Sequence, residues 1–449
     1  MTETIESFIR KEKPENYYEE LTGELEKLNS KFRMFSNINK EIGSGLPFSV
    51  KDNICVKDVE STASSEILSG YLPPFSATAI ERLMEGEFGF LGKTKMDEFG
   101  FGTFGTNCKD YPLNPFDERY VTGGSSAGSA AATAVLKHHV SIAESTGGSI
   151  SAPSSFCGVV GFTPTYGIVS RYGLIDYANS LDKIGVMARS AADVRYVFDK
   201  IKGSDGNDTT CVDHPISKEG YKKLIVIEQL MEGVDQEVLS SFDRTLAKLQ
   251  NMGYTVERRS VPFIEKAIPA YYIVSMAEAS TNLARYTGFK YGLKINDFSK
   301  GYNDFFTEAR NSFGQEAKRR IVLGTFVRSA SVKSKYYEKA LQLRQMLIGS
   351  LNRILKEGFI ISPTMPIKTP TVEEVNGLDP VKVYVRDSIT VPPNFAGLPH
   401  ISFPSDYIKG MPTGTQLVTS HFNDYALLDF VEEWEKSFEY KFKYNVGAL

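Results

Sequence analysis

Residues 122–161 read TGGSSAGSAAATAVLKHHVSIAESTGGSISAPSSFCGVVG, and we expect the fold to be organised around this stretch. It holds two clusters of glycine and serine, at residues 123–126 and 146–149. Glycine leaves backbone N–H groups unshielded and permits close approach to a ligand. A serine hydroxyl beside such amides is suited to acyl transfer, although either cluster alone is also typical of an ordinary turn.

The residues between the two clusters predict how the clusters are arranged. Residues 125–137 are rich in alanine and predict a helix, and residues 140–143 form a short apolar run typical of a strand. The order loop, helix, strand, loop therefore brings two serine-bearing loops into the same neighbourhood.

The composition is typical of a globular protein and gives no sign of nucleic-acid or membrane binding. The chain has 449 residues, of which 41% are hydrophobic and 24% charged, as in soluble globular proteins. Its net charge of −4 gives no sign of nucleic-acid binding. The first 21 residues are too acidic and too polar to predict a signal or transit peptide, and no apolar run approaches the length of a membrane span. We therefore expect a cytoplasmic protein.

The cysteines argue against both a zinc site and a disulfide framework. They are scattered, with no C-x-x-C pair and no histidine at a ligand-like spacing, at Cys55, Cys108, Cys157 and Cys211. We expect reduced thiols and no metal in this chain.

Outside the central stretch, helical and strand patterns alternate. Helices are predicted at residues 15–38, 77–87, 191–201, 235–251, 263–286, 425–434 and over most of 316–355. Strands are predicted at 88–92, 224–227, 255–258, 359–362, 400–403 and 416–420, and residues 203–220 form a linker-like loop. The alternation favours an α/β fold with a single large mixed β-sheet that is covered by helices.

Residues 46–56, LPFSVKDNICV, look like an apolar strand that is interrupted by Lys51, Asp52 and Asn53. A lysine in an apolar segment is rarely buried without a role, although a turn at a strand edge would also explain it. A second lysine, Lys93, lies in a Gly-Lys-Thr triplet that resembles the end of a phosphate-binding loop. The glycine that such a loop requires five places earlier is Glu87, so we exclude ATP binding there.

Ser126 lies in a literal G-x-S-x-G match, but a serine-histidine-aspartate mechanism is disfavoured. A nucleophile elbow needs an apolar strand directly before it, and residues 118–121 are ERYV. None of the five histidines lies in a motif-like setting. A lysine can act as the base if burial keeps it neutral, which makes Lys51 the leading candidate, with a second serine as a possible bridge to the nucleophile.

The combination of Lys51-Asp52-Asn53 with GGSSxGS and TGGSI resembles the amidase signature family. The resemblance implies that family's fold, with helices on both faces of the sheet, and a catalytic triad. On this sequence the triad falls on Lys51 as the base, Ser125 as a bridging serine after a cis peptide bond, and Ser149 as the nucleophile. The resemblance also assigns the oxyanion hole to the amides of Thr146, Gly147, Gly148 and Ser149.

Further motifs resemble the glutaminase chains of tRNA-dependent amidotransferases, and the resemblance covers residues ~40–440. They include residues 158–185, 318–321 and 393–399. The resemblance implies that Tyr271, Arg320 and Asp387 hold glutamine. An amino acid does need a cation for its carboxylate and an anion for its ammonium group, although Arg320 could also be a surface charge on a helix.

The resemblance implies a glutaminase that hydrolyses glutamine and supplies ammonia to a partner, the B subunit. The B subunit would bind charged tRNA and use ATP and Mg²⁺ to amidate Glu-tRNA(Gln), or Asp-tRNA(Asn), and a small C subunit would bridge the two. No cofactor is expected in this chain. The implied domains are an N-terminal helical segment at 1–40, an amidase domain at 41–440 with its signature core at about 45–205, and a tail at 441–449.

Two departures from the family keep other functions open. The family usually has D-T-G-G-S-I-R around the nucleophile, whereas Ser145 and Ser151 replace the acid and the arginine here. Exchange of a partly buried ion pair for neutral residues can be close to neutral in stability. The alternatives are a free-standing amidase for small amides, which would not need the glutamine-binding set, and a non-catalytic scaffold protein, against which the intact triad argues.

Overall fold

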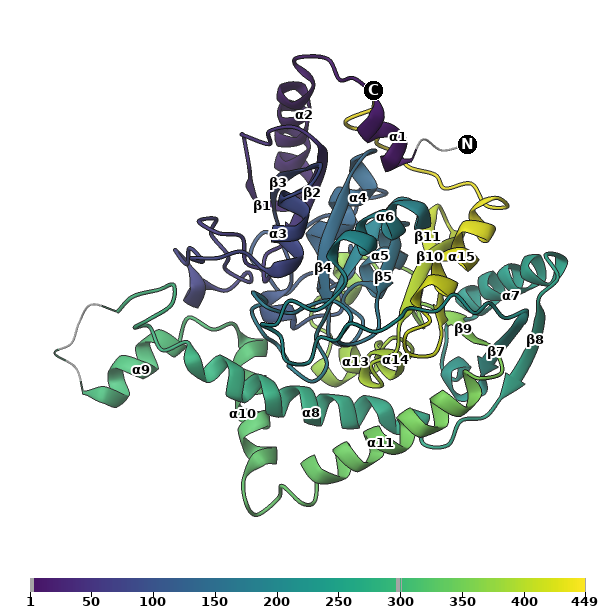
Figure 1. The fold of residues 1–449 in the computed structure, drawn as a ribbon. Coiled ribbons are helices and arrows are strands. Elements are labelled where there is room, and N and C mark those ends of the chain that lie inside the picture. Colours follow the sequence, from purple (N-terminus) through teal and green to yellow (C-terminus); the bar gives the residue numbers. More distant parts are fainter. Residues whose placement is uncertain (1–3, 296–298, 300, 449) are drawn as a thin grey trace.

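The centre of the molecule is one mixed β-sheet of 11 strands, seen in a computed structural model that describes residues 4–295, 299 and 301–448 (Figure 1). Residues 1–3 of the expected N-terminal segment and Leu449 of the expected tail lie outside the described residues. In order across the sheet, the strands are β1 (Phe35–Ile38), β3 (Phe88–Thr94), β2 (Leu46–Lys51), β4 (Val140–Ser145), β6 (Lys183–Ala188), β5 (Val160–Thr163), β10 (His400–Ile408), β11 (Met411–Val418), β9 (Phe359–Pro363), β7 (Lys223–Ile227) and β8 (Thr255–Arg259).

Parallel and antiparallel pairs alternate in blocks across this sheet. Strand β2 runs parallel to β3 and β4, and β7 runs parallel to β8 and β9. The strands between these blocks, from β4 to β9, pair antiparallel, as do β1 and β3. The predicted α/β class with a single large mixed sheet is therefore confirmed.

Helices cover the sheet, and the central stretch contributes two of them. The helices are α1 (Ile5–Arg10), α2 (Tyr17–Phe32), α3 (Thr78–Met84), α4 (Ala127–Val135), α5 (Ser151–Cys157), α6 (Ala191–Ile201), α7 (Gln236–Asn251), α8 (Ala267–Asn282), α9 (Tyr302–Arg310), α10 (Gln315–Arg328), α11 (Tyr337–Ile354), α12 (Val372–Val375), α13 (Pro380–Val385), α14 (Val391–Phe395) and α15 (Asp424–Glu435).

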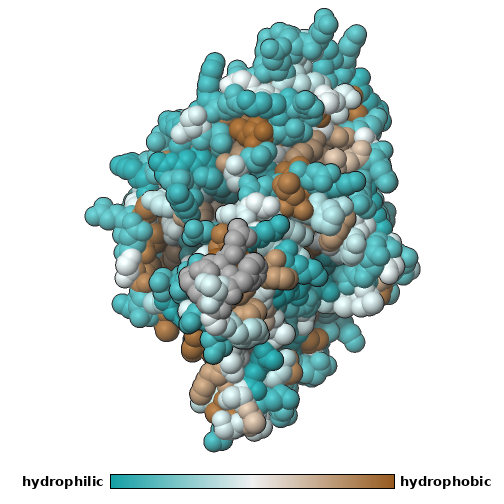
Figure 2. Space-filling view, turned by 90° about the vertical axis from the view of Figure 1, so that its left-hand side faces the viewer, coloured by the Kyte–Doolittle hydropathy of each residue, from teal (hydrophilic) through white to brown (hydrophobic). Residues whose placement is uncertain are grey.

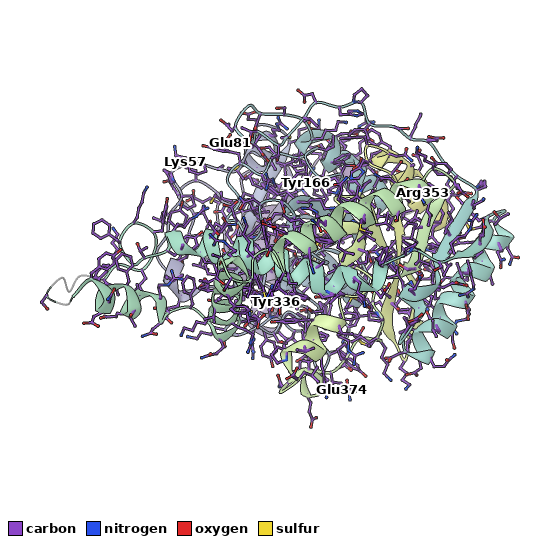
Figure 3. The ribbon with its side chains drawn as sticks, turned by 90° about the horizontal axis from the view of Figure 1, so that it is seen from below. Lys57, Glu81, Tyr166, Tyr336, Arg353 and Glu374 are labelled. Carbon is purple, nitrogen blue, oxygen red and sulfur yellow. The ribbon has the colours of Figure 1, made fainter. Side chains whose placement is uncertain are left out.

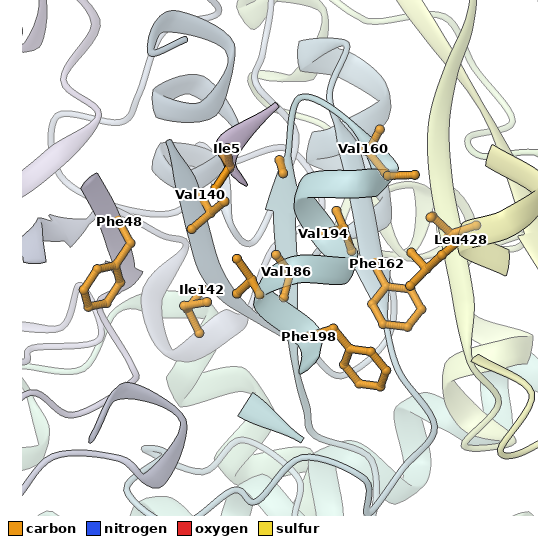
Figure 4. Close-up of a cluster of buried hydrophobic side chains, with 14 of the residues drawn as sticks. Ile5, Phe48, Val140, Ile142, Val160, Phe162, Val186, Val194, Phe198 and Leu428 are labelled. Atoms are coloured by element: carbon orange, nitrogen blue, oxygen red, sulfur yellow. The ribbon is translucent and has the colours of Figure 1, made fainter. Parts of the chain in front are cut away.

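Strand β4 shows how its two faces are covered by different helices. Side chains alternate across a strand, so neighbours point to opposite faces. Val140 and Ile142 belong to the large core cluster that includes residues of α6 and α15 (Figure 4). Ala143 packs instead with Ala130 and Ala134 of α4. The loops at the two ends of α4 and β4 are thereby fixed between two layers of helix.

The N-terminal helix is shorter than the sequence predicts. Helix α2 ends at Phe32, and Arg33 adopts a left-handed conformation with φ 56°. Residues 35–38, predicted as the end of that helix, form strand β1, which pairs with β3. Hydrogen bonding at the sheet edge therefore overrides the helical pattern here.

The sequence predicts neither β5 nor β6, and both contain an interior glycine. Glycine is normally unfavourable in a strand and often marks a close approach of another backbone or side chain. A Cβ at Gly161 would lie 2.0 Å from Ser154 Oγ of α5, and one at Gly185 would lie 2.2 Å from the carbonyl oxygen of Phe162. Close packing in the folded chain requires glycine at both positions. Local strand propensity does not include such contacts, so the sequence pattern missed these strands.

The long helices α8, α10 and α11 lie along the lower edge of the molecule (Figure 1). Tyr336 and Arg353 mark the two ends of α11 in the view from below (Figure 3). The face in Figure 2 is mostly hydrophilic, with small separate hydrophobic areas. No helix in the described part of the chain has the length and hydropathy needed to span a membrane.

Candidate active site

The structure brings Lys51 and Ser125 into direct contact. Lys51 is the last residue of β2 and is fully buried. Its Nζ lies 2.8 Å from Ser125 Oγ and 2.9 Å from the carbonyl oxygen of Glu144. The peptide bond between Gly124 and Ser125 is cis, as the family resemblance implies. The interruption of the apolar run by Lys51 is therefore a buried polar site and not an exposed turn.

Ser149 lies in the loop between β4 and α5, and it lines a pocket. The residue is 7% exposed, and the Ser149 carbonyl oxygen accepts a hydrogen bond from the amide of Ser126 at 3.2 Å. This bond ties the two glycine-serine loops together. The pocket lining is Gly100, Gly102, Thr103, Gly124, Gly147, Gly148, Ser149, Tyr177, Tyr271, Tyr272, Arg320 and Asp387.

Gly147 and Gly148 have no room for a side chain. A Cβ at Gly147 would lie 2.5 Å from the Tyr271 hydroxyl oxygen, and one at Gly148 would lie 2.3 Å from Thr390 Oγ1. Thr146, the other residue predicted for the oxyanion hole, has a hydroxyl that contacts the Glu144 carboxylate. The glycines let this loop approach α8 and the segment before α14 closely.

The three residues predicted to hold glutamine all line the same pocket. Tyr271 is on α8, Arg320 on α10 and Asp387 in the segment between α13 and α14. Arg320 is 3% exposed, so it is not the surface charge that its helical setting would also allow. Its Nε donates to Glu316 Oε1 at 2.8 Å, and its Nη1 donates to the Tyr177 hydroxyl.

Asp387 provides a negative group in this pocket. Tyr272 and Thr103 donate to Asp387 Oδ2, at 2.7 and 3.1 Å. Burial raises the pKa of Asp387 to about 6, although these hydrogen bonds and the charge of Arg320 oppose the rise. The pocket therefore offers one cation and one carboxyl group, close to Ser149.

Several residues at this site were not predicted. Glu144 contacts Lys51, Asp182 contacts Thr146, and Thr103, Tyr177 and Tyr272 line the pocket. Glu144 had one signal in the sequence, since it is a charged residue that directly follows an apolar run. The others depend on contacts between segments far apart in the sequence.

The positions where the sequence departs from the family are both buried. Ser145 Oγ donates to Asn394 Oδ1 at 3.2 Å, and Ser151 Oγ has no hydrogen-bond partner among the described residues. Both side chains are fully buried. The described residues hold no group of three or more His, Cys, Asp or Glu side chains that could bind a metal ion.

The family of this chain follows from comparison with known proteins. A family model described as Amidase matches residues 17–428. The chain belongs to the amidase family. The predicted membership of the amidase signature family is thereby confirmed.

Three relatives of this amidase carry the name of the A subunit of glutamyl-tRNA(Gln) amidotransferase. The amidase is 40% identical to the A subunit of Pseudothermotoga lettingae over 404 residues, which are 87% of this chain and 86% of the relative. It is 38% identical to that of Sulfolobus acidocaldarius over 466 residues, 97% and 96% of the two chains. The crystal structure of the Thermotoga maritima protein of the same name superposes with a TM-score of 0.83 at 31% identity, covering 99% of this amidase and 98% of that chain.

Proposed function

We propose that this amidase is the glutamine-hydrolysing component of a tRNA-dependent amidotransferase. The observation that carries the proposal is that Ser149 lines one pocket with Arg320 and Asp387. An arginine and an aspartate suit the carboxylate and the ammonium group of an amino acid. The names and the full-length coverage of the relatives support the same function.

In the proposed mechanism Ser149 attacks the side-chain amide carbon of glutamine. Its proton passes to Ser125 and on to Lys51, which contacts the Ser125 hydroxyl at 2.8 Å. The amides of Thr146, Gly147, Gly148 and Ser149 would stabilise the oxyanion. Ammonia leaves, and water then hydrolyses the γ-glutamyl ester on Ser149 along the same route.

Glutamine recognition is proposed for Tyr271, Arg320 and Asp387. Arg320 would pair with the α-carboxylate and Asp387 with the α-ammonium group, while the Tyr271 ring packs beside Gly147. Charge-assisted hydrogen bonds of this kind are roughly twice as strong as neutral ones. A simple amide without these two charges would gain nothing from the pair.

We propose that the partners are the B and C subunits of the amidotransferase. The B subunit would bind charged tRNA, use ATP and Mg²⁺ and receive the ammonia, and the complex would be cytoplasmic. This division of labour fits the Glu87 that excludes a P-loop in this chain. The proposed domains remain an N-terminal segment at 1–40, which is mostly helical but also contributes β1, an amidase domain at 41–440 and a short tail.

Replacement of Ser149 tests the proposal. Ser149→Ala should abolish ammonia release from glutamine and leave amidation by added ammonia intact in the assembled complex, because only the first reaction needs the nucleophile. Ser126→Ala is the matched control, since Ser126 is the serine of the G-x-S-x-G match, and it should keep most of the activity. Full glutamine hydrolysis by Ser149→Ala would refute the proposal.

The same assay separates the two alternatives. A free-standing amidase would hydrolyse simple amides as fast as glutamine and without partners. A scaffold protein would give no glutamine-dependent product in any complex, and Ser149→Ala would then change nothing.

A further inference from the structure

A buried carboxylate lies directly behind Lys51. Glu144, near the end of β4, has a side chain that is 1% exposed, and its Oε2 is 2.9 Å from Lys51 Nζ. Asn53 Nδ2 donates to the same oxygen at 3.1 Å. The mechanism proposed above assigns no task to this group.

The contacts of Lys51 match the three protons of an ammonium group in number. Its Nζ has three acceptors, which are Ser125 Oγ, the Glu144 carbonyl oxygen and Glu144 Oε2. An ammonium group has no lone pair and cannot take a proton from Ser125. In that form Lys51 can act as a base only if it first passes on a proton, and the carboxylate is the most basic of its three acceptors.

A second buried carboxyl group, that of Asp182, lies close to Glu144. The contacts of the two groups bear on which of them carries a proton. The Thr146 hydroxyl lies 2.6 Å from Glu144 Oε1 and 2.9 Å from Asp182 Oδ1. One hydroxyl proton serves only one of them at a time, and a proton on the other carboxyl, donated to Thr146, satisfies both contacts. Burial and the charge of Glu144 raise the pKa of Asp182 well above its usual range. We therefore assign this proton to Asp182, which leaves Glu144 as the acceptor.

We propose that Glu144 is the final proton acceptor when Ser149 attacks glutamine, and that Lys51 is a relay. This inference rests on the proposed function. One Lys51 proton moves to Glu144 Oε2, which frees a lone pair on Nζ; as the Ser149 Oγ–carbon bond forms, the Ser149 proton moves to Ser125 and the Ser125 proton moves to Nζ. Ser125 and Lys51 each gain and lose one proton. The negative charge of Glu144 appears on the substrate oxygen.

Collapse of the tetrahedral intermediate runs the relay backwards. As the carbon–nitrogen bond breaks, the proton on Glu144 returns through Lys51 and Ser125 to the leaving nitrogen, which departs as ammonia. Lys51 carries the same number of protons before and after each step. The only net change in the buried network is therefore the protonation state of Glu144.

Glu144→Gln tests the relay because glutamine has the shape of glutamate and still accepts a hydrogen bond from Lys51, but cannot take its proton. Loss of a proton acceptor typically lowers kcat by about 10²–10⁴-fold, and we expect that loss with little change in KM for glutamine. Glu144→Asp keeps a carboxylate, so its kcat should be at least about tenfold higher than that of Glu144→Gln. A purely steric role would not predict this difference.

Asp424→Asn is the control for neutralising a buried carboxylate. Asp424 belongs to α15 and is fully buried, and it accepts hydrogen bonds from the amide and hydroxyl of Thr165 at 2.8 and 2.7 Å. Its variant should keep the kcat of the parent. Two measurements are made for all variants. They are the kinetics of ammonia release from glutamine, in the assembly that hydrolyses it, and thermal unfolding.

The outcomes separate the relay from the proposed function. If Ser149→Ala abolishes hydrolysis while Glu144→Gln keeps or exceeds the parental kcat, the relay is wrong and the proposed function stands. The same conclusion holds if Glu144→Asp is no more active than Glu144→Gln. If Ser149→Ala retains hydrolysis, the proposed function fails, and the relay fails with it.

Discussion

At the scale of single residues, two buried lysines at neighbouring strand ends have different partners. Lys51 Nζ contacts a serine hydroxyl and a carboxylate. Lys93 Nζ donates to Ser61 Oγ at 2.9 Å and to the carbonyl oxygens of Asp52, at 3.4 Å, and Ile54. Lys93 therefore holds the turn after β2, whereas the contacts of Lys51 lead toward the pocket.

Asp387 should make glutamine binding depend on pH. Its pKa is raised to about 6 by burial, so it gains a proton as the pH falls through about 6 and can no longer pair with an ammonium group. We expect KM for glutamine to rise below pH 6 in the parent. Asp387→Asn should raise KM by about tenfold or more and remove this pH dependence.

Ionisation of Asp387, which favours glutamine binding, should lower the stability of the folded protein. Because the pKa of Asp387 is raised in the folded state, its favourable contribution is complete below pH about 4 and is lost as the pH rises through 6. At pH 8 the ionised group costs stability, so Asp387→Asn should unfold at the same or a higher temperature. A lower unfolding temperature at pH 8, or an unchanged KM, would contradict this assignment.

At the scale of elements, the turn after β2 is tied to residues 62–64 and to Lys93 of β3. Asp52 Oδ2 accepts hydrogen bonds from the amides of Thr62 and Ser64, at 3.1 and 3.2 Å. Its other oxygen lies 3.9 Å from Lys93 Nζ. Burial raises the pKa of Asp52 and lowers that of Lys93, so each charge depends on the other.

Removal of one partner of this pair should destabilise the protein. Lys93→Met leaves the Asp52 carboxylate without its cation, and we expect the free energy of unfolding to fall by about 3–5 kcal/mol. Adding Asp52→Asn should recover part of that loss, because the unpaired charge is removed. Urea unfolding of both single variants and the double variant measures the coupling. A loss below about 1 kcal/mol in Lys93→Met would contradict the role given to this pair.

At the scale of the whole molecule, segments from the N-terminus to the C-terminus pack on one another around the sheet. Helix α1 lies against α6, where the amide of Ile5 donates to Asp193 Oδ1 at 2.8 Å. Phe8 is fully buried and stacks on His138, just before β4, with ring centroids 4.5 Å apart. The first helix thus supports the end of α4–β4 that lies away from the serine loops.

Truncation of Phe8 should therefore reduce stability and leave catalysis unchanged. Phe8→Ala is expected to lower the free energy of unfolding by about 3–5 kcal/mol, since it leaves a cavity in the core. Glu6→Ala, which alters an exposed residue of the same helix, is the control and should change it by less than about 0.5 kcal/mol. Urea unfolding and glutamine kinetics are the measurements, and an altered kcat in Phe8→Ala would show that α1 influences the site.

The sequence by itself determined the alternation of elements and the family. Local periodicity located strands β4 and β7 and helix α6 because each pattern lies within a few neighbouring residues. It failed at β1, where pairing with β3 ends the helical pattern, and at the glycine-containing β5 and β6. The candidate triad and the glutamine-binding set came from motif resemblance, and their roles remain predictions.

Only the tertiary structure decided which polar groups meet inside the site. Lys51 meets Ser125 and Glu144, which are 74 and 93 residues away in sequence, because β2 and β4 are neighbours in the sheet. The contact between Thr146 and Asp182 follows in the same way from the pairing of β4 with β6. Sheet order and register are not encoded in any short stretch of sequence. The carboxylate behind Lys51 therefore became visible only in the folded chain.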